Sequence, residues 1–396
     1  MLTMVHSNGA RIEQGVLRVD RKFLTGMRRY AEQIEGPLMT IHPEMGPNCQ
    51  TMDLIEVSCK DLGFEVMTIK EHGASMAAKA GLHAQIARSS LMYGSGLGST
   101  DIAKRLGIPY IMVLEYDLRT QIVMNMQVPN LARRGVRSLR SVARYVSHHI
   151  PAMRGALALH CNGYPIYDEA RLFNANRLLY LDSRMSANMV IPESQLESRL
   201  QQRSGRPLRL LFSGRYERVK GADDSVRVAI ECLRRGLNIE LHTYGQGDLR
   251  EKMLGLALHS SFADRIHIHD SVTYPELIER SRECDLFVCC HIQSDPSCSY
   301  LESFGAGLPI VGYANRMWDR LSATSLCGAA SALGKPAQVA DHIACLLSDD
   351  VTLGLLSKRA RAFALAHTFE HEFSLRTDAL KQSLARIRHS HVTRQS

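Results

Sequence analysis

The stretch that decides the fold is Asp285-Leu286-Phe287-Val288-Cys289-Cys290, followed by the polar residues 291–302 and by Gly307-Leu308-Pro309-Ile310-Val311. It indicates an apolar strand, a polar loop, a short helix that carries Glu302, a Gly-Leu-Pro break and a second strand. A strand, a helix and a strand in this order are typical of a βαβ unit in a parallel sheet. We therefore predict an α/β fold.

Similar apolar runs, rich in β-branched residues, alternate with helical patterns along most of the chain. We expect strands in the first half near residues 16–19, 38–41, 54–57, 65–69, 90–93 and 110–114, and in the second half near 208–213, 239–244, 265–268, 286–290 and 310–312. A polar, Ser- and Arg-rich stretch at 192–207 has no strand pattern and is interpreted as a linker. The prediction is two Rossmann-like domains, residues 1–195 and 206–364, followed by a C-terminal helix and tail at 365–396.

Composition excludes several classes of protein. The 396 residues include 48 Lys and Arg against 40 Asp and Glu, and 45% are hydrophobic, which is typical of a globular chain. No stretch approaches the ~20 apolar residues of a membrane-spanning helix, and the first residues have no signal-peptide core. The ten cysteines include no C-x-x-C pair, so we expect reduced thiols, no zinc site and a cytoplasmic protein.

Positive charge gathers in residues 118–167, which contain seven arginines and no Asp or Glu. Apolar residues recur there at steps of three and four, beside an arginine stripe formed by Arg133, Arg137, Arg140 and Arg144. Such a helix can lie on an anionic lipid surface or bind phosphates, so we expect peripheral contact with the inner membrane or an anionic acceptor. The alternative is a core-facing helix whose arginines are only solvated. With 6% aromatic residues and no nucleic-acid motif, no nucleic-acid partner is expected.

Several catalytic motifs are absent from the sequence. It contains no P-loop, no H-E-x-x-H, no G-x-S-x-G and no D-x-D, so we expect no metal and no cofactor. The run Gly94–Gly98 follows a predicted strand but has the spacing G-x-G-x-G, which favours a tight turn and leaves a nicotinamide-dependent oxidoreductase as an alternative. His367, His371 and Glu372 have metal-like spacing and are interpreted as residues of a solvated helix face.

A basic loop directly follows the first strand of the second half. It contains Gly214, Arg215, Lys220 and Gly221. Ligands of open α/β sheets bind at the carboxyl ends of the strands, and an arginine and a lysine there could hold an oxyanion. Taken alone, the loop could also be a basic surface turn.

The deciding stretch adds a second anion-binding feature. A helix that begins at Pro296 or Ser297 would point free N–H groups at an anion in the loop. Glu302 would lie within that helix, where its carboxylate could accept both hydroxyls of a ribose. The alternative for Glu302 alone is an ordinary helical glutamate.

Together these motifs resemble the nucleotide-sugar half of GT-B glycosyltransferases, specifically the retaining family 4. The family pattern runs G-R-x4-K-G, G-x-G, a strand with a donor loop, E-x7-E and G-x-P-[IV]-V. This chain supplies, in order, Gly214-Arg215, Lys220-Gly221, Gly245-Gln246-Gly247, Asp285–Cys290, Glu302 and 307–311. The resemblance covers roughly residues 208–344 and implies a metal-independent, retaining glycosyltransferase that uses a UDP- or GDP-linked sugar.

The resemblance also assigns roles to individual residues. Arg215 and Lys220 would hold the donor diphosphate beside Gly214, and Glu302 would bind the ribose. Ser294, Asp295, Pro296 and Ser297 would face the donor sugar, and the backbone amides of Ser299, Tyr300 and Leu301 would help to bind phosphate. One departure is that the first acid of E-x7-E falls on Ser294, with Asp295 one position later.

The first half matches the family's acceptor domain in pattern rather than in sequence. Val16–Asp20, a turn through Gly26 and a helix at 27–34 resemble its opening strand, loop and helix, with Gly26 nearest to the sugar. Glu115 stands where the family commonly has a histidine, and would contact the acceptor or donor sugar. The alternative is that Glu115 is an exposed strand-end carboxylate.

The function that this resemblance implies is transfer of a sugar to a glycan or lipid-linked acceptor, in cell-surface polysaccharide synthesis. The C-terminal helix would cross back to the first domain. A catalytically inactive GT-B module that binds a sugar or a partner remains the alternative, because Ser294 replaces an acid.

Overall fold

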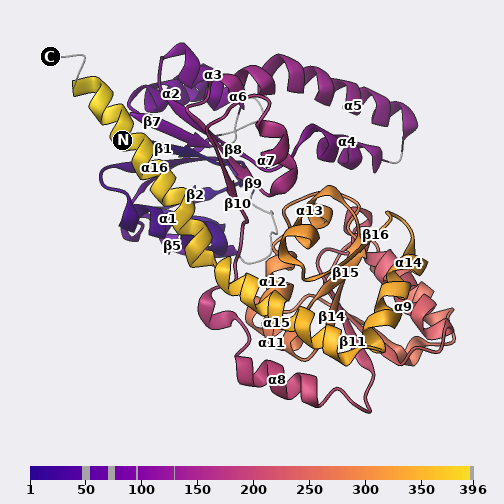
Figure 1. Cartoon of the computed structure of the whole chain (residues 1–396). Coiled ribbons are helices and arrows are strands. Elements are labelled where there is room, and N and C mark those ends of the chain that lie inside the picture. Colours follow the sequence, from indigo (N-terminus) through magenta and orange to yellow (C-terminus); the bar gives the residue numbers. More distant parts are fainter. Residues whose placement is uncertain (47–53, 70–75, 95–96, 129, 393–396) are drawn as a thin grey trace.

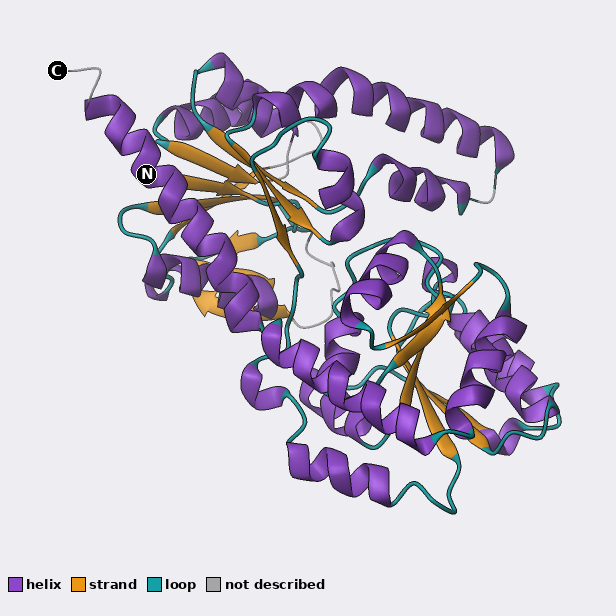
Figure 2. Cartoon of the chain, in the orientation of Figure 1, coloured by secondary structure: helices purple, strands orange, loops and turns teal. Residues whose placement is uncertain are grey.

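The computed structural model describes residues 1–46, 54–69, 76–94, 97–128 and 130–392. Two α/β domains face each other, each built on a parallel sheet with helices on both sides (Figures 1 and 2). The predicted fold class, with two Rossmann-like domains, is therefore confirmed.

The first domain has a seven-stranded parallel sheet in the order β10-β9-β8-β7-β1-β4-β6. Its strands are β1 (Leu2–Val5), β4 (Leu38–Pro43), β6 (Glu65–Ile69), β7 (Leu91–Gly94), β8 (Tyr110–Leu114), β9 (Ala158–Asn162) and β10 (Arg177–Tyr180). Its helices are α1 (Arg21–Gln33), α2 (Met76–Ala87), α3 (Leu97–Arg105), α4 (Leu118–Met126), α5 (Leu131–Arg144), α6 (Ile150–Gly155) and α7 (Tyr164–Ala170). Gly94 ends β7 where an added Cβ would lie 2.3 Å from the Val5 carbonyl oxygen, so close strand packing requires this glycine.

The expected opening of this domain is wrong in one respect. The stretch Val16–Asp20 forms β3 of a separate antiparallel sheet, in which it pairs with β2 (Arg11–Glu13) and β5 (Leu54–Ser58). The opening strand is β1, which lies between β4 and β7 in the parallel sheet. Three of its four residues are buried, so this strand forms part of the core of the first domain.

The second domain has a six-stranded parallel sheet in the order β13-β12-β11-β14-β15-β16. Its strands are β11 (Leu208–Ser213), β12 (Ile239–Tyr244), β13 (Ile266–His269), β14 (Leu286–Cys289), β15 (Ile310–Tyr313) and β16 (Gly328–Ser331). Its helices are α9 (Ala222–Arg234), α10 (Arg250–Leu258), α11 (Tyr274–Arg282), α12 (Ser299–Gly305), α13 (Arg316–Ser325), α14 (Pro336–Leu347) and α15 (Asp350–Ala366). Leu210 and Val288 point to one face of the sheet, Leu211 and Phe287 to the other, and both faces are buried.

The stretch expected to be only a linker contains a helix, α8 (Glu193–Gln201). Its Arg199 is buried and donates hydrogen bonds to the carbonyl oxygens of Ala306 and Gly307, both at 2.8 Å. The helix is therefore attached to the second domain at the end of α12.

The C-terminal helix α16 (Phe369–Val392) crosses from the second domain to the first, as expected (Figure 1). Phe373, Leu380 and Ile387 pack in the core of the first domain. The solvated-face interpretation is wrong for Glu372, which is buried and accepts a hydrogen bond from the Leu181 amide at 2.8 Å and from His367 Nδ1 at 2.6 Å.

No helix among the described residues is both long enough and apolar enough to cross a membrane. The nine cysteines in the described part of the chain are free thiols, and six of them are buried.

Candidate functional site

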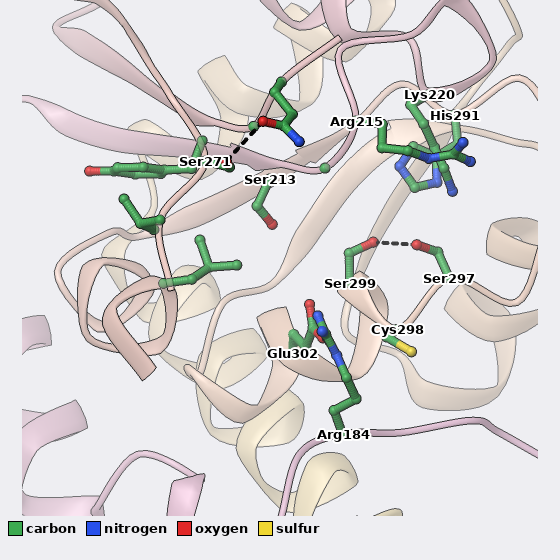
Figure 3. Close-up of a pocket in the computed structure, with 16 residues that line it drawn as sticks. Arg184, Ser213, Arg215, Lys220, Ser271, His291, Ser297, Cys298, Ser299 and Glu302 are labelled. Carbon is green, nitrogen blue, oxygen red and sulfur yellow. Dashed lines mark hydrogen bonds and ion pairs between the residues drawn. The ribbon is translucent and has the colours of Figure 1, made fainter. Parts of the chain in front are cut away.

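A pocket of about 240 Å³ lies at the carboxyl ends of the strands of the second domain (Figure 3). The end of β11 and the loop after it contribute Ser213, Gly214, Arg215 and Lys220, and the region of β12, β13 and α11 contributes Tyr244, Gly245, Gln246, Ser271, Val272 and Leu277. The loop after β14 and helix α12 contribute His291, Ser297, Cys298, Ser299 and Glu302, and Arg184 comes from the segment that crosses between the domains. The pocket thus brings Arg215, Lys220 and Glu302 together, as the sequence predicts.

The cationic end of the pocket contains Lys220 and Arg215, which lie beside His291 in Figure 3. Lys220 is buried and its Nζ lies 2.5 Å from Asp295 Oδ2. Burial opposes ionisation of Asp295, but the Lys220 ammonium outweighs it and lowers the pKa of the carboxyl. Arg215 is more exposed and pairs with Glu217 at 2.9 Å.

His291 is uncharged at neutral pH. Burial and then the Lys220 ammonium lower its pKa to about 3. The charged groups at this end are therefore two cations, each paired with one carboxylate. A diphosphate could take the place of those carboxylates.

The opposite end of the pocket is defined by Glu302 (Figure 3). Its Oε1 accepts hydrogen bonds from Arg184 Nε at 3.0 Å and from Arg184 Nη2 at 2.7 Å. The Arg184 guanidinium also lies over the Tyr274 ring, 4.3 Å from its centroid. Both bonds use one carboxylate oxygen, which leaves the other for a ligand. Arg184 was missed because it lies in an irregular crossing segment without a motif.

The donor loop runs into α12 later than expected. The helix begins at Ser299 rather than at Pro296 or Ser297, with Cys298 as its N-cap residue. The Ser297 and Ser299 hydroxyls hydrogen-bond to each other at 2.8 Å at the pocket wall. The Tyr300 amide donates a hydrogen bond to the Ser297 carbonyl at 3.3 Å. This turn therefore has fewer free N–H groups for binding phosphate than expected.

Tyr300 and Leu301 contribute core packing with their side chains. Both are buried, and Tyr300 Oη accepts a hydrogen bond from Asn315 Nδ2 at 3.2 Å. Their predicted contribution concerned backbone amides, and the side chains do not line the pocket.

Three donor-loop residues expected to face the sugar lie outside the pocket wall. Ser294 Oγ accepts a hydrogen bond from the Arg316 amide at 3.1 Å, at the start of α13. Asp295 faces Lys220, as described above. Pro296 packs against Gly163 of the first domain: a Cβ added at Gly163 would lie 3.1 Å from the Cβ of Pro296.

In the first domain, the expected turn through Gly26 is wrong. Asp20 caps α1 by accepting from the Phe23 amide at 3.2 Å, and Gly26 lies inside this helix, where an added Cβ would lie 3.8 Å from Phe373. Gly26 packs toward α16 rather than lining the pocket. The residue of α1 that approaches the pocket is Lys22, which contacts the lining residue Cys298.

Lys22 Nζ donates a hydrogen bond to the Asp182 carboxylate and lies 3.5 Å from the Cys298 sulfur. Burial opposes the charge on Lys22, but Cys298 and Asp182 outweigh it and raise the pKa of the ammonium. A third cation, from the opposite domain, therefore adjoins the start of α12. The sequence signal that could have found it is the Asp20 N-cap, which moves the helix start to Arg21.

Glu115 follows β8 and faces the cleft between the domains. Its side chain is exposed, but enclosure by the two domains, and then the Asp182 and Asp295 carboxylates, raise its pKa. It does not line the pocket. Its proposed contact with a sugar stays a prediction.

The described residues bring one set of metal-ligand side chains together outside this pocket. Ligand atoms of Glu240, His242 and His267 lie within 4.8 Å of one another. However, Arg209 and Arg265 lie 3.9 and 3.8 Å from the Glu240 carboxylate, and these cations oppose a metal ion there.

Residues 207–349 match the family model described as glycosyl transferases group 1. A comparison with curated proteins found no match.

Among solved structures, the chain is similar to HepE from Anabaena in complex with UDP, with a TM-score of 0.68, 12% identity and coverage of 97% of this chain and 99% of that one. It is similar to sucrose-phosphate synthase from Thermosynechococcus elongatus, with a TM-score of 0.69, 14% identity and coverage of 97% and 99%. It is also similar to WaaG, a glycosyltransferase involved in lipopolysaccharide biosynthesis, with a TM-score of 0.62, 15% identity and coverage of 96% and 99%.

Proposed function

We propose that this chain, which has the GT-B fold and a second domain that matches group 1 glycosyltransferases, moves a sugar from a nucleoside-diphosphate sugar to a glycan or lipid-linked acceptor. The observation that carries the proposal is the convergence of Arg215, Lys220 and Glu302 on one pocket. Retention of anomeric configuration is carried over from the family resemblance.

The cations supply the chemistry that sugar transfer needs. When the bond between the anomeric carbon and the diphosphate breaks, its electron pair stays on the departing diphosphate. Arg215 and Lys220 would stabilise that growing charge more strongly than the charge of the intact donor, and this difference lowers the barrier. The proposal assigns this task to side chains and calls for no metal ion.

Glu302 would bind the nucleoside. Arg184 holds one of its carboxylate oxygens, and the other would accept from the ribose hydroxyls. Tyr244, Val272 and Leu277 provide apolar surface nearby for the base. UDP is the first nucleotide to test, because the HepE structure contains it; GDP remains the alternative.

We place the reaction on the cytoplasmic side of the membrane, in cell-surface polysaccharide synthesis, with peripheral binding to the inner leaflet. The role of WaaG in lipopolysaccharide biosynthesis supports this setting by analogy.

The decisive experiment is a thermal-shift titration with UDP and GDP, followed by a transfer assay on a panel of nucleotide sugars. UDP or GDP at 100 times its Kd should stabilise the native chain by about 2.7 kcal/mol. Lys220→Ala and Glu302→Ala should abolish most of that shift, whereas the exposed-site controls Arg234→Ala and Glu251→Ala should retain it. No shift with either nucleotide would contradict the proposal.

A second candidate is a binding module without catalysis. Ser294, which replaces the first acid of the family motif, turns its hydroxyl to the Arg316 amide rather than to the pocket. Binding of UDP or GDP without transfer from any donor in the panel would support this candidate.

A further inference from the structure

We propose that α4 and α5 form a membrane-docking hairpin that binds an anionic phospholipid bilayer through an apolar stripe and an adjoining arginine stripe. The inference deepens the proposed function and rests on it only for the choice of the inner leaflet. The surface itself is defined by the exposure and charge of the hairpin.

The hairpin projects from the first domain, with α5 on its outer side (Figure 1). No residue of α5 is buried. The helix is held by its inner face, where Asn125 Nδ2 of α4 donates to Ser141 Oγ at 2.9 Å and Arg134 Nε donates to the Val128 carbonyl at 2.5 Å. Its outer face is therefore free to contact a second surface.

That outer face carries apolar residues at helical spacing. Val136, Leu139, Ala143 and Val146 succeed one another at steps of three and four, and Val136, Leu139 and Val146 are 49%, 71% and 57% exposed. Leu131 at the start of the helix is 76% exposed. Large apolar side chains that gather on one exposed face usually mark an interaction surface.

The charges beside this stripe are all of one sign. Arg133, Arg137, Arg140 and Arg144 follow the apolar residues along α5, and among the described residues none of the four forms an ion pair with a carboxylate. The sequence from 118 to 167 contains no acidic residue. An apolar stripe flanked by arginines fits a surface that offers acyl chains below phosphate groups, which is an anionic bilayer.

A shallow groove strengthens the choice of lipid. It is lined by Arg140, Ala143, Arg144, Ser147 and His148 at the end of α5. Two guanidinium groups and a hydroxyl at one hollow could hold a lipid head-group phosphate.

The base of the hairpin is attached to the catalytic cleft. Asp117 caps α4 by accepting from the Thr120 amide at 2.9 Å, and it also pairs with Arg316 of α13. The Arg316 amide donates to Ser294 in the donor loop. A bilayer bound by the hairpin would therefore lie beside the entrance for a lipid-linked acceptor.

The test is flotation of the full chain with vesicles of phosphatidylcholine alone and with 30% phosphatidylglycerol. We expect the wild type to prefer the anionic vesicles and to dissociate from them as salt rises. Arg137→Glu with Arg140→Glu should weaken that binding about 10- to 100-fold, and Leu131→Ser with Leu139→Ser should weaken it at low and high salt alike. Matched controls are Arg234→Glu with Arg388→Glu, and Leu258→Ser with Val351→Ser.

The UDP-induced thermal shift, measured without vesicles, should be the same in both hairpin variants, so loss of lipid binding is distinguishable from loss of the donor site. Equal flotation on both vesicle types, or hairpin variants that bind as well as the controls, would overturn the proposal. A wild-type dimer in solution that Leu131→Ser with Leu139→Ser converts to monomer, without vesicle binding, would instead identify the stripe as a contact between copies.

Discussion

Lys220 is the residue whose surroundings most directly reflect the proposed chemistry. Its ammonium is buried, and a buried charge needs a partner. Asp295 provides one at 2.5 Å, on the loop that would face the donor sugar. The incoming diphosphate would offer the same cation a second partner, so Asp295 can hold Lys220 in place until the donor binds. Asp295 would thus act on the site through Lys220, although it is one position away from the family's acid.

Replacing Asp295 with Asn should therefore have two opposite effects. It should lower the stability of the free protein by about 3 kcal/mol, because Lys220 is left buried without a counter-charge. It should also enlarge the UDP-induced rise in melting temperature, because the diphosphate now relieves that cost. Differential scanning fluorimetry with and without UDP measures both. Asp264→Asn, at an exposed position of the same domain outside the pocket, is the matched control. An equal or smaller UDP shift in Asp295→Asn would contradict this account.

Lys22 was not predicted, and it provides the sharpest residue-scale test of domain cooperation. It belongs to the first domain but approaches Cys298 of the second. If it stabilises the departing diphosphate only when the domains enclose the donor, Lys22→Ala should reduce kcat about 10- to 100-fold and change the UDP affinity little. Lys60→Ala, an exposed lysine in the same domain, serves as control. A variant that loses UDP affinity and kcat equally would assign Lys22 to ground-state binding.

At the scale of elements, the strands with long apolar and β-branched runs were predictable, and β8 and β11 have the expected bounds. The missed strands include β1, β9, β10 and β16, which are four or five residues long and contain Met, Arg, His, Asn or Ser, so they lack that pattern. The helix α8 was missed because its polar face dominates the sequence, and its attachment depends on Leu196 and Arg199, whose partners lie about a hundred residues away. Such contacts cannot be inferred from local periodicity.

Helix α8 also supports the helix that carries Glu302. Arg199 donates to the carbonyls that end α12, and Gly307 turns the chain there with φ +68°. A cation at a helix C-terminus satisfies carbonyls that have no partner within the helix. Arg199→Ala should therefore lower the free energy of unfolding by about 3 kcal/mol and weaken UDP binding.

Urea unfolding followed by the fluorescence of Trp318, the single tryptophan of the chain, reports on this domain. Glu197→Ala, on the exposed side of α8, should change stability by less than about 0.5 kcal/mol. If Arg199→Ala behaves like this control, the contact with α12 contributes nothing measurable to the domain.

At the scale of the whole molecule, the two domains meet through charged pairs and close packing. Asp117 pairs with Arg316, and Arg320 lies 3.3 Å from Asp168. Gly163 leaves room for Met317 and Pro296 at the same interface. None of these pairings was predicted, because each joins residues of different domains whose relative placement the sequence does not specify. The fold of each domain follows from local patterns, whereas the shape of the cleft depends on how the two folds meet.

Buried neutral histidines make the stability of the whole molecule depend on pH. Burial lowers the pKa of His160 to about 3, and Arg376 adds to the effect. Burial is also the main cause of the lowered pKa values of His6, His42 and His291. Because an unfolded histidine has a pKa near 6.5, only the unfolded chain binds the proton between about pH 6.5 and pH 3. Unfolding is therefore favoured as the pH falls through this range, and stability is fully present above it.

For His160 alone, lowering the pH from 7.5 to 5.0 should remove about 2 kcal/mol of stability. His160→Gln removes this titration and can still face the Tyr93 hydroxyl, which lies 3.3 Å from His160 Nδ1. The loss of stability between the two pH values should therefore be about 2 kcal/mol smaller in the variant, as measured by urea unfolding with circular dichroism. His259→Gln, at an exposed position, should show the wild-type loss; the same loss in all three proteins would mean that His160 accepts a proton without unfolding.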